Sequence, residues 1–134
     1  MVESRTTGVF NAAGPRSPMT MREQLTGIRA AVNPAQDVRF TWVPAEFLVE
    51  QKVAPWGDMP TWLPKTDPEY ALSNTDTTRA VKAGLTYRSL ATSSVDALSW
   101  FDAQPEAART QMMKAGLTPE REGQVLEAWR ARSR

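Results

Sequence analysis

The chain offers a narrow set of side chains for chemistry, because it contains neither histidine nor cysteine. This excludes a Ser-His-Asp or Cys-His nucleophile, thiol redox chemistry and the common His/Cys zinc sites. None of its seven glycines belongs to a GxGxxG turn or a P-loop, so no phosphate-binding loop is visible. Any catalysis would therefore depend on carboxylates, tyrosine, lysine or a bound cofactor.

A proline-rich stretch, residues 54–68, is the first candidate for a binding surface. Its prolines exclude regular helix or strand, and Trp56 and Trp62 lie between them. On a loop these tryptophans would line a substrate cleft; alternatively they fill the core beneath the loop, since Trp is highly buried on average. Asp58 and Asp67 have the chemistry of an acid–base pair, although solvation at the surface is the simpler interpretation.

Two further polar residues adjoin expected elements. Asn11 follows the apolar pair Val9 and Phe10, and a buried amide must be hydrogen-bonded. It either braces the turn at residues 14–15 or contacts a ligand. Asp76 precedes an apolar helical segment and suits a helix cap better than a catalytic role.

The hydrophobic pattern predicts two short strands among several helices. Residues 8–12 form a short apolar run before a Gly-Pro stop, and residues 38–43 alternate apolar and polar positions. Helices are expected after a Thr20–Glu23 capping box, after Pro44, after Asp76, around residues 95–101, after Pro105 and after Thr118-Pro119. The expected order is β-α-β-α-loop-α-α-α-α.

Length and composition bound the class of protein. The 134 residues suit one domain, and 41% are hydrophobic, which suffices for a core. The 16 basic and 15 acidic residues leave a formal charge of +1, so neither nucleic acid nor an anionic membrane is an expected partner. No apolar run reaches the roughly 20 residues needed to span a bilayer, and the first residues have no signal-peptide core. We therefore expect a cytoplasmic protein.

Five segments, in order, resemble the C-terminal part of extended short-chain dehydrogenases/reductases, the NAD-dependent epimerase/dehydratase family. Residues 7–15 resemble the family's G-x-[FY]-N-x-x-G strand, and the helix after Thr20 follows it as in the family. Residues 73–80 resemble the D-x-[ST]-[KR]-A helix start, residues 83–88 the LG-[WYF]-x-P turn, and residues 95–100 the closing L-x-D-T-x-x-W helix. The tail, residues 115–122, together with residues 40–43 and 53–56, resembles a bacterial subgroup usually labelled only epimerase or reductase.

The resemblance implies an α/β fragment: the last Rossmann-type strand plus a small, mostly helical substrate-binding domain. Residues 1–134 would be the substrate-side region, without the N-terminal domain that binds NAD(P). In the family a Tyr-x-x-x-Lys pair helps to transfer the hydride, but Tyr70 is followed at the lysine position by Asn74 and Tyr87 by Ala91. No catalytic residue, cofactor-binding residue or metal ligand therefore carries over, and the chain would be inactive alone.

Two functions follow as expectations. In the first, the chain forms one wall of a cleft for a small carbonyl or hydroxyl compound, with Trp56, Trp62 and Asn11 as candidate substrate contacts. The aromatic loop favours an apolar or flat substrate, since no lysine or arginine lies between Lys52 and Lys65 to bind a diphosphate. In the second, the chain is a stand-alone interaction module whose C-terminal helices bind a protein partner. Met112 and Met113, with Leu117, are expected to pack between the terminal helices or, alternatively, to form the partner surface. Self-association is expected because Val9 and Phe10 of the first strand would lack the neighbouring strand that the family provides.

Overall fold

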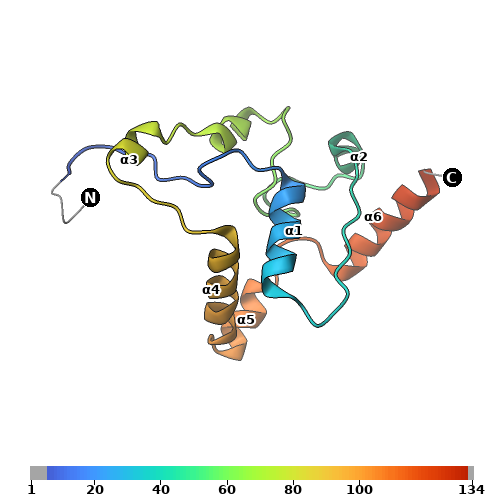
Figure 1. Ribbon diagram of the computed structural model, residues 1–134. Coiled ribbons are helices and arrows are strands. Elements are labelled where there is room, and N and C mark those ends of the chain that lie inside the picture. Colours follow the sequence, from blue (N-terminus) through green and yellow to red (C-terminus); the bar gives the residue numbers. More distant parts are fainter. Residues whose placement is uncertain (1–5, 133–134) are drawn as a thin grey trace. The chain divides into compact units, whose positions relative to one another are not determined.

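The computed structural model describes residues 6–132, without the side chain of Ser73. In these residues the regular elements are helices (Figure 1): α1 (Met21–Val32), α2 (Ala45–Glu50), the 3-10 helix η1 (Pro68–Asn74), α3 (Thr78–Lys82), α4 (Leu90–Asp102), α5 (Glu106–Met112) and α6 (Pro119–Arg132). No strand occurs in this part of the chain. The β contact there is an isolated bridge between Pro55 and Met59.

The expected α/β class is therefore wrong for the described residues, which form a helical fold. Residues 8–12 and 38–43 have extended-type sequences but no regular structure. A β-strand is held by hydrogen bonds to a neighbouring strand, and neither segment pairs with one. The last Rossmann-type strand, expected at residues 8–12, is thus an irregular segment here. The α-helices of this part of the chain, whose caps and stops are local, form where the sequence predicts them, whereas the 3-10 helix η1 was not predicted.

The chain divides into two compact units. Unit 1 contains the residues up to Asp37 together with Ala71–Phe101, and unit 2 contains Val38–Tyr70 together with the residues from Asp102 onward. Unit 1 holds α1, α3 and α4, and unit 2 holds α2, α5 and α6. Each unit combines two segments that are far apart in the sequence.

In unit 1, α1 starts at the predicted capping box. The Thr20 hydroxyl accepts a hydrogen bond from the Glu23 amide at 3.2 Å, and the Glu23 carboxylate accepts one from the Thr20 amide at 2.8 Å. The helix ends at Asn33, which adopts a left-handed conformation with φ of 42°. Gly27 lets α1 approach α4 closely, because a Cβ atom there would lie 2.8 Å from a methyl group of Leu90.

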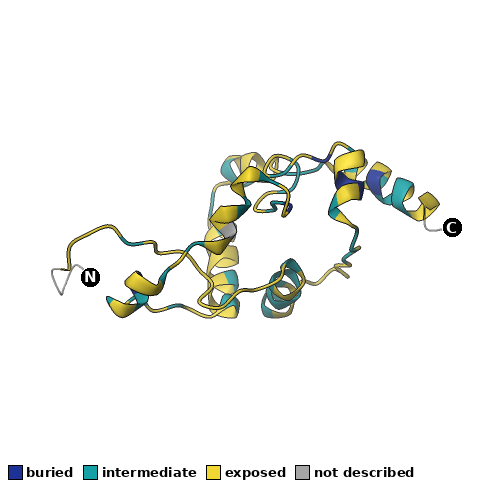
Figure 2. Cartoon of the chain, turned by 90° about the horizontal axis from the view of Figure 1, so that it is seen from above, coloured by how far each residue is buried: buried dark blue, intermediate teal, exposed yellow. Residues whose placement is uncertain are grey.

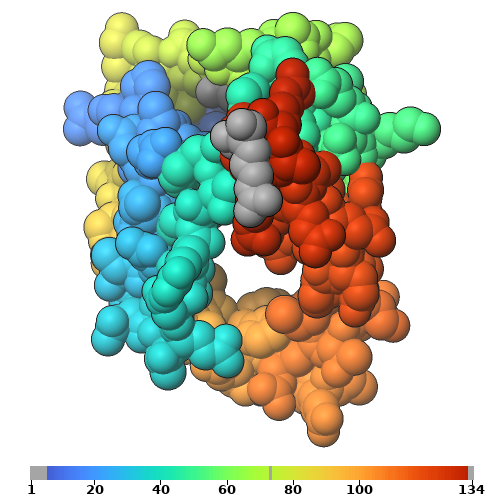
Figure 3. All heavy atoms as spheres, turned by 90° about the vertical axis from the view of Figure 1, so that its right-hand side faces the viewer, coloured from blue at the N-terminus to red at the C-terminus, as the bar shows by residue number. Residues whose placement is uncertain are grey.

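Unit 2 contains most of the buried apolar side chains of the described residues. Phe47 and Leu48 of α2, Val53 and Val125 of α6 form one cluster, shown in dark blue in Figure 2. The Phe47 and Trp129 rings meet edge-to-face with centroids 5.0 Å apart. In Figure 3, α6 lies against the chain segment that includes α2. Hydrophobic burial between these two helices is therefore the main stabilising contact of unit 2.

Polar contacts between α2 and α6 accompany this cluster. Arg132 forms an ion pair with Glu50 at 2.5 Å, and Arg121 donates a hydrogen bond to the Gln51 carbonyl. Thr118 caps α6, as predicted, by accepting a hydrogen bond from the Arg121 amide at 3.2 Å. Among the described residues, no helix is both long and apolar enough to cross a bilayer.

Candidate functional site

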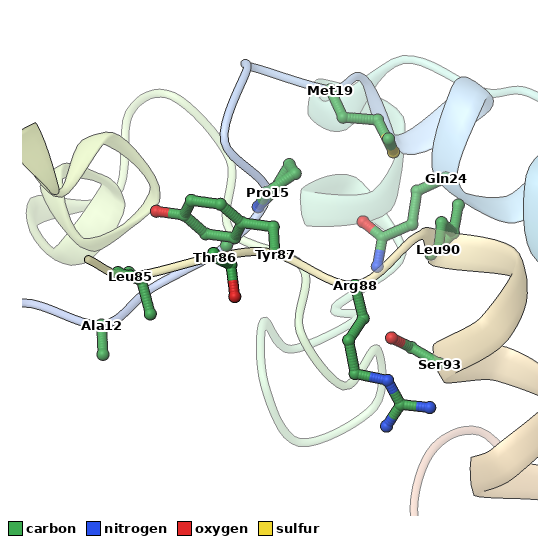
Figure 4. A pocket seen from close by; sticks show the side chains of 11 residues that line it. Ala12, Pro15, Met19, Gln24, Leu85, Thr86, Tyr87, Arg88, Leu90 and Ser93 are labelled. Atoms are coloured by element: carbon green, nitrogen blue, oxygen red, sulfur yellow. The ribbon is translucent and has the colours of Figure 1, made fainter. Parts of the chain in front are cut away.

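A pocket of about 520 Å³ lies within unit 1 (Figure 4). Three segments form it: the chain that leads into α1 with the first turn of that helix, the link between α3 and α4, and the start of α4. The lining residues are Ala12, Gly14, Pro15, Met19, Gln24, Leu85, Thr86, Tyr87, Arg88, Leu90 and Ser93.

Local sequence features position the link between α3 and α4. Gly84 ends α3 with φ of 97°, a conformation that favours glycine. The chain then runs without regular structure through residues 85–89 until α4 begins at Leu90. Directly before α4, the Ser89 hydroxyl accepts a hydrogen bond from the Thr92 amide at 3.0 Å, which is a helix N-cap contact. This fixes Tyr87 and Arg88 between two helix ends.

The N-terminal segment lies beside this link. A Cβ atom at Gly14 would be 3.5 Å from the Tyr87 ring, an ordinary van der Waals distance, so Gly14 lies beside this ring. Asn11 donates a hydrogen bond from Nδ2 to the Asp76 carbonyl at 3.1 Å, and the Arg79 guanidinium lies 4.8 Å from the centre of the Phe10 ring. These contacts hold residues 8–15 against α3 and the segment that follows it.

The wall of the unit 1 pocket is largely apolar, and polar side chains lie along one side of it. Pro15, Met19, Leu85 and Leu90 contribute apolar surface, and Tyr87 contributes its half-buried ring. The Tyr87 hydroxyl oxygen is buried and has no hydrogen-bond partner in the described residues. A buried polar atom without a partner costs free energy.

Arg88 supplies a positive charge to the polar side. Its guanidinium forms an ion pair with Asp96 of α4, and the two side chains are 60% and 57% exposed. Figure 4 shows the polar ends of Gln24 and Ser93 directed toward Arg88. A pocket with this lining suits a small organic molecule that is apolar over most of its surface and polar at one end.

The candidate substrate residue Asn11 lies next to this pocket rather than in its lining. Its side chain is exposed and bonds the Asp76 backbone. This contact differs from the expected bracing of the turn at residues 14–15, because it joins two segments distant in sequence. Asn11 therefore positions the segment that carries Ala12, Gly14 and Pro15 into the pocket wall.

Trp56 and Trp62 lie in unit 2, and neither lines the unit 1 pocket. Trp62 is half-buried against the cluster of Phe47, Leu48 and Val125. Trp56 is 50% exposed and has φ of 60°, a left-handed conformation that is costly for a bulky residue. The two tryptophans therefore have different surroundings: Trp62 has those of a core residue, and Trp56 those of a surface loop.

Asp58, Asp67 and Asp76 each accept a hydrogen bond from a nearby backbone amide. Asp58 accepts from Ala54 at 2.8 Å, Asp67 from Glu69 at 2.8 Å, and Asp76 from Thr78 at 2.9 Å. Hydrogen bonds from Thr78 hold the pKa of Asp76 below its usual value, and Lys82 lowers it further. These carboxylates stabilise turns and a helix start. Within the described residues, no group of three or more Asp, Glu, His or Cys side chains is arranged to hold a metal ion.

Sequence reasoning missed Tyr87, Arg88, Gln24 and Ser93 as site residues. The Tyr87-Arg88 pair could have been found from the sequence, because it lies shortly after Gly84 in a link between two expected helices. Such links commonly carry binding residues. Gln24 and Ser93 gave no such signal, because each is a polar residue on an amphipathic helix.

Comparison with protein-family models, with curated proteins and with solved structures finds no match to this chain.

Proposed function

We propose that this chain is the substrate-binding part of an NAD(P)-dependent epimerase, dehydratase or reductase that acts on a small carbonyl or hydroxyl compound. One observation carries the proposal: the five segments that resemble motifs of extended short-chain dehydrogenases/reductases lie in unit 1, whereas the segments that resemble the bacterial subgroup, residues 40–43, 53–56 and 115–122, lie in unit 2. Residues 7–15, 73–80, 83–88 and 95–100 all belong to unit 1, and the first and third of them line its pocket.

The chemistry of the chain supports a binding role rather than a catalytic one. It has no Gly-rich turn or Tyr-x-x-x-Lys pair, and these are the groups that hold NAD(P) and assist hydride transfer in the family. A separate nucleotide-binding half therefore supplies the cofactor and the catalytic residues, and this chain supplies a wall of the substrate site. A cytoplasmic location accords with this role.

Reading the DNA upstream of the Met1 codon tests the proposal. We expect an in-frame continuation that encodes a Gly-rich turn and a Tyr-x-x-x-Lys pair. The extended polypeptide should bind NADH or NADPH in calorimetry with a Kd below about 10 µM, near −7 kcal/mol. The 134-residue chain is the matched control and should not bind at that level. Absence of such a continuation, or equally tight binding by the short chain, would refute the proposal.

A second candidate function is a stand-alone module that binds a protein through its C-terminal helices. The observation in its favour is that Met113, at the end of α5, is 74% exposed and Met112 is 39% exposed. Flexible methionines on a surface suit protein recognition. A promoter and ribosome-binding site directly upstream of Met1 would favour this candidate over the first.

A further inference from the structure

Arg88, Gln24 and Ser93 form the polar side of the unit 1 pocket, and Met19, Leu85 and Leu90 form part of its apolar wall. We propose that this pocket binds a small organic acid, with the ligand carboxylate at Arg88 and its apolar portion against the wall. This proposal names the substrate class of the proposed function. It rests on that function only for the reaction that the bound acid would undergo, because binding the acid needs no cofactor.

The ion pair with Asp96 leaves Arg88 able to bind a ligand. A guanidinium has five N–H donors, and the contact with Asp96 is made through Nη2. Both side chains are more than half exposed, and such surface pairs are weak because water screens them. A carboxylate can therefore bind Arg88 beside Asp96 or in exchange for it, with two parallel hydrogen bonds to the guanidinium.

The remaining lining restricts the ligand to a monoanion. Arg88 is the cationic residue of the lining, and Asp96 already offsets its charge. A phosphate monoester or a diphosphate carries a larger negative charge and would need more cations. Gln24 and Ser93 add hydrogen-bonding groups suited to a hydroxyl or carbonyl oxygen next to the carboxylate. The chemistry therefore favours a hydroxy acid or oxo acid with an apolar side group.

Mandelate, a hydroxy acid with a phenyl group, is a suitable probe, and neutral mandelamide is its isosteric control. Titration of the isotope-labelled full chain, followed by NMR, should show mandelate shifting the backbone amides of residues 86–93. A ligand of this size should bind with a Kd on the order of 1 mM. Mandelamide should bind at least about fivefold more weakly, because it lacks the charge-assisted contact with Arg88.

Three variants separate this role from a structural one. Arg88→Gln should weaken mandelate binding about fivefold and leave mandelamide binding unchanged. Asp96→Asn should strengthen mandelate binding about twofold, because it removes the competing carboxylate. Lys82→Gln makes the same charge change on α3, outside the pocket lining, and should have no effect.

Equal binding of mandelate and mandelamide, or equal effects of Arg88→Gln and Lys82→Gln, would overturn the inference, as would shifts confined to residues outside the pocket. A failure here is distinguishable from a failure of the proposed function. The latter is decided by the upstream reading frame and by NAD(P) binding of the extended polypeptide, and neither depends on mandelate.

Discussion

Trp56 and Trp62 lie in the same proline-rich stretch, but substitution should affect stability much less at Trp56 than at Trp62. Trp62→Ala should lower the free energy of unfolding by about 2 kcal/mol, somewhat below the cost for a fully buried tryptophan, because Trp62 is half-buried against the unit 2 cluster. Trp56→Gly should change it by less than about 1 kcal/mol, since relief of the left-handed conformation offsets the lost contacts. Urea denaturation followed by circular dichroism measures both.

A similar loss of stability in the two variants would contradict this difference. The same pair of variants also addresses the expected substrate contacts. In an intact enzyme that contains this region, a Trp56 variant that keeps its stability but raises KM would place substrate at the loop. Unchanged kinetics in that variant would exclude Trp56 as a substrate contact.

Asp58 closes the turn formed by residues 54–59. Its carboxylate accepts from the Ala54 amide at 2.8 Å, and its backbone carbonyl accepts from the Leu117 amide at 2.9 Å. Asp58→Ala removes the side-chain acceptor and should cost about 1 kcal/mol of unfolding free energy. Asp58→Asn keeps an oxygen acceptor and should cost less than half as much. Equal losses from the two substitutions would instead indicate a role for the charge.

At the scale of elements, the start of α1 makes stability depend on pH. Backbone and side-chain hydrogen bonds from Thr20 hold the pKa of Glu23 below its usual value of 4.5. A carboxyl group with a lowered pKa in the folded state stabilises the fold above its unfolded pKa, and this contribution is lost as the pH falls through the folded pKa. The helix should therefore weaken as the pH falls below about 4.5.

Thermal melts of two variants across this pH range measure the contribution. Glu23→Gln should reduce the loss of stability at low pH. Asp76, whose pKa is also lowered, should account for part of the loss that this variant still shows. Thr20→Ala should cost about 1 kcal/mol at neutral pH, whereas Thr20→Ser should retain the cap. If Glu23→Gln left the dependence of stability on pH unchanged, the capping box would not be the cause of that dependence.

At the scale of the whole molecule, apolar exposure predicts self-association. Among the described residues of unit 1, the buried hydrophobic side chain is that of Ala80. The α4 side chains of Val95, Leu98 and Trp100 are 44%, 42% and 57% exposed. Exposed apolar surface of this kind promotes association. We expect helical circular dichroism, a broad melting transition and a sedimentation coefficient that rises with concentration.

The double substitution Val95→Gln and Leu98→Gln should reduce this association. Both side chains are already partly exposed, so the helical signal should persist. A sharp two-state melt from a monomer at high concentration would contradict the expectation. It would also favour the stand-alone module over the substrate-side part of a larger enzyme.

The α-helices of the described residues follow from local sequence features. The Thr20 capping box and the Thr118 cap both lie where the sequence predicts them. The physical reason is that each depends on residues within one or two turns of the same helix. Asp76, predicted as the cap of α3, lies one residue before the N-cap Thr77 and accepts a hydrogen bond from the Thr78 amide.

The strands and the pocket depend instead on contacts between segments that are far apart in the sequence. Residues 8–12 and 38–43 have strand-like patterns, but a strand depends on a partner that the pattern does not specify. Asn11 bonds Asp76, 65 positions later in the sequence, and Gly14 lies beside Tyr87, also more than 60 residues away. Contacts at that separation follow from packing rather than from local periodicity, which is why Tyr87 and Arg88 became candidates only in the folded chain.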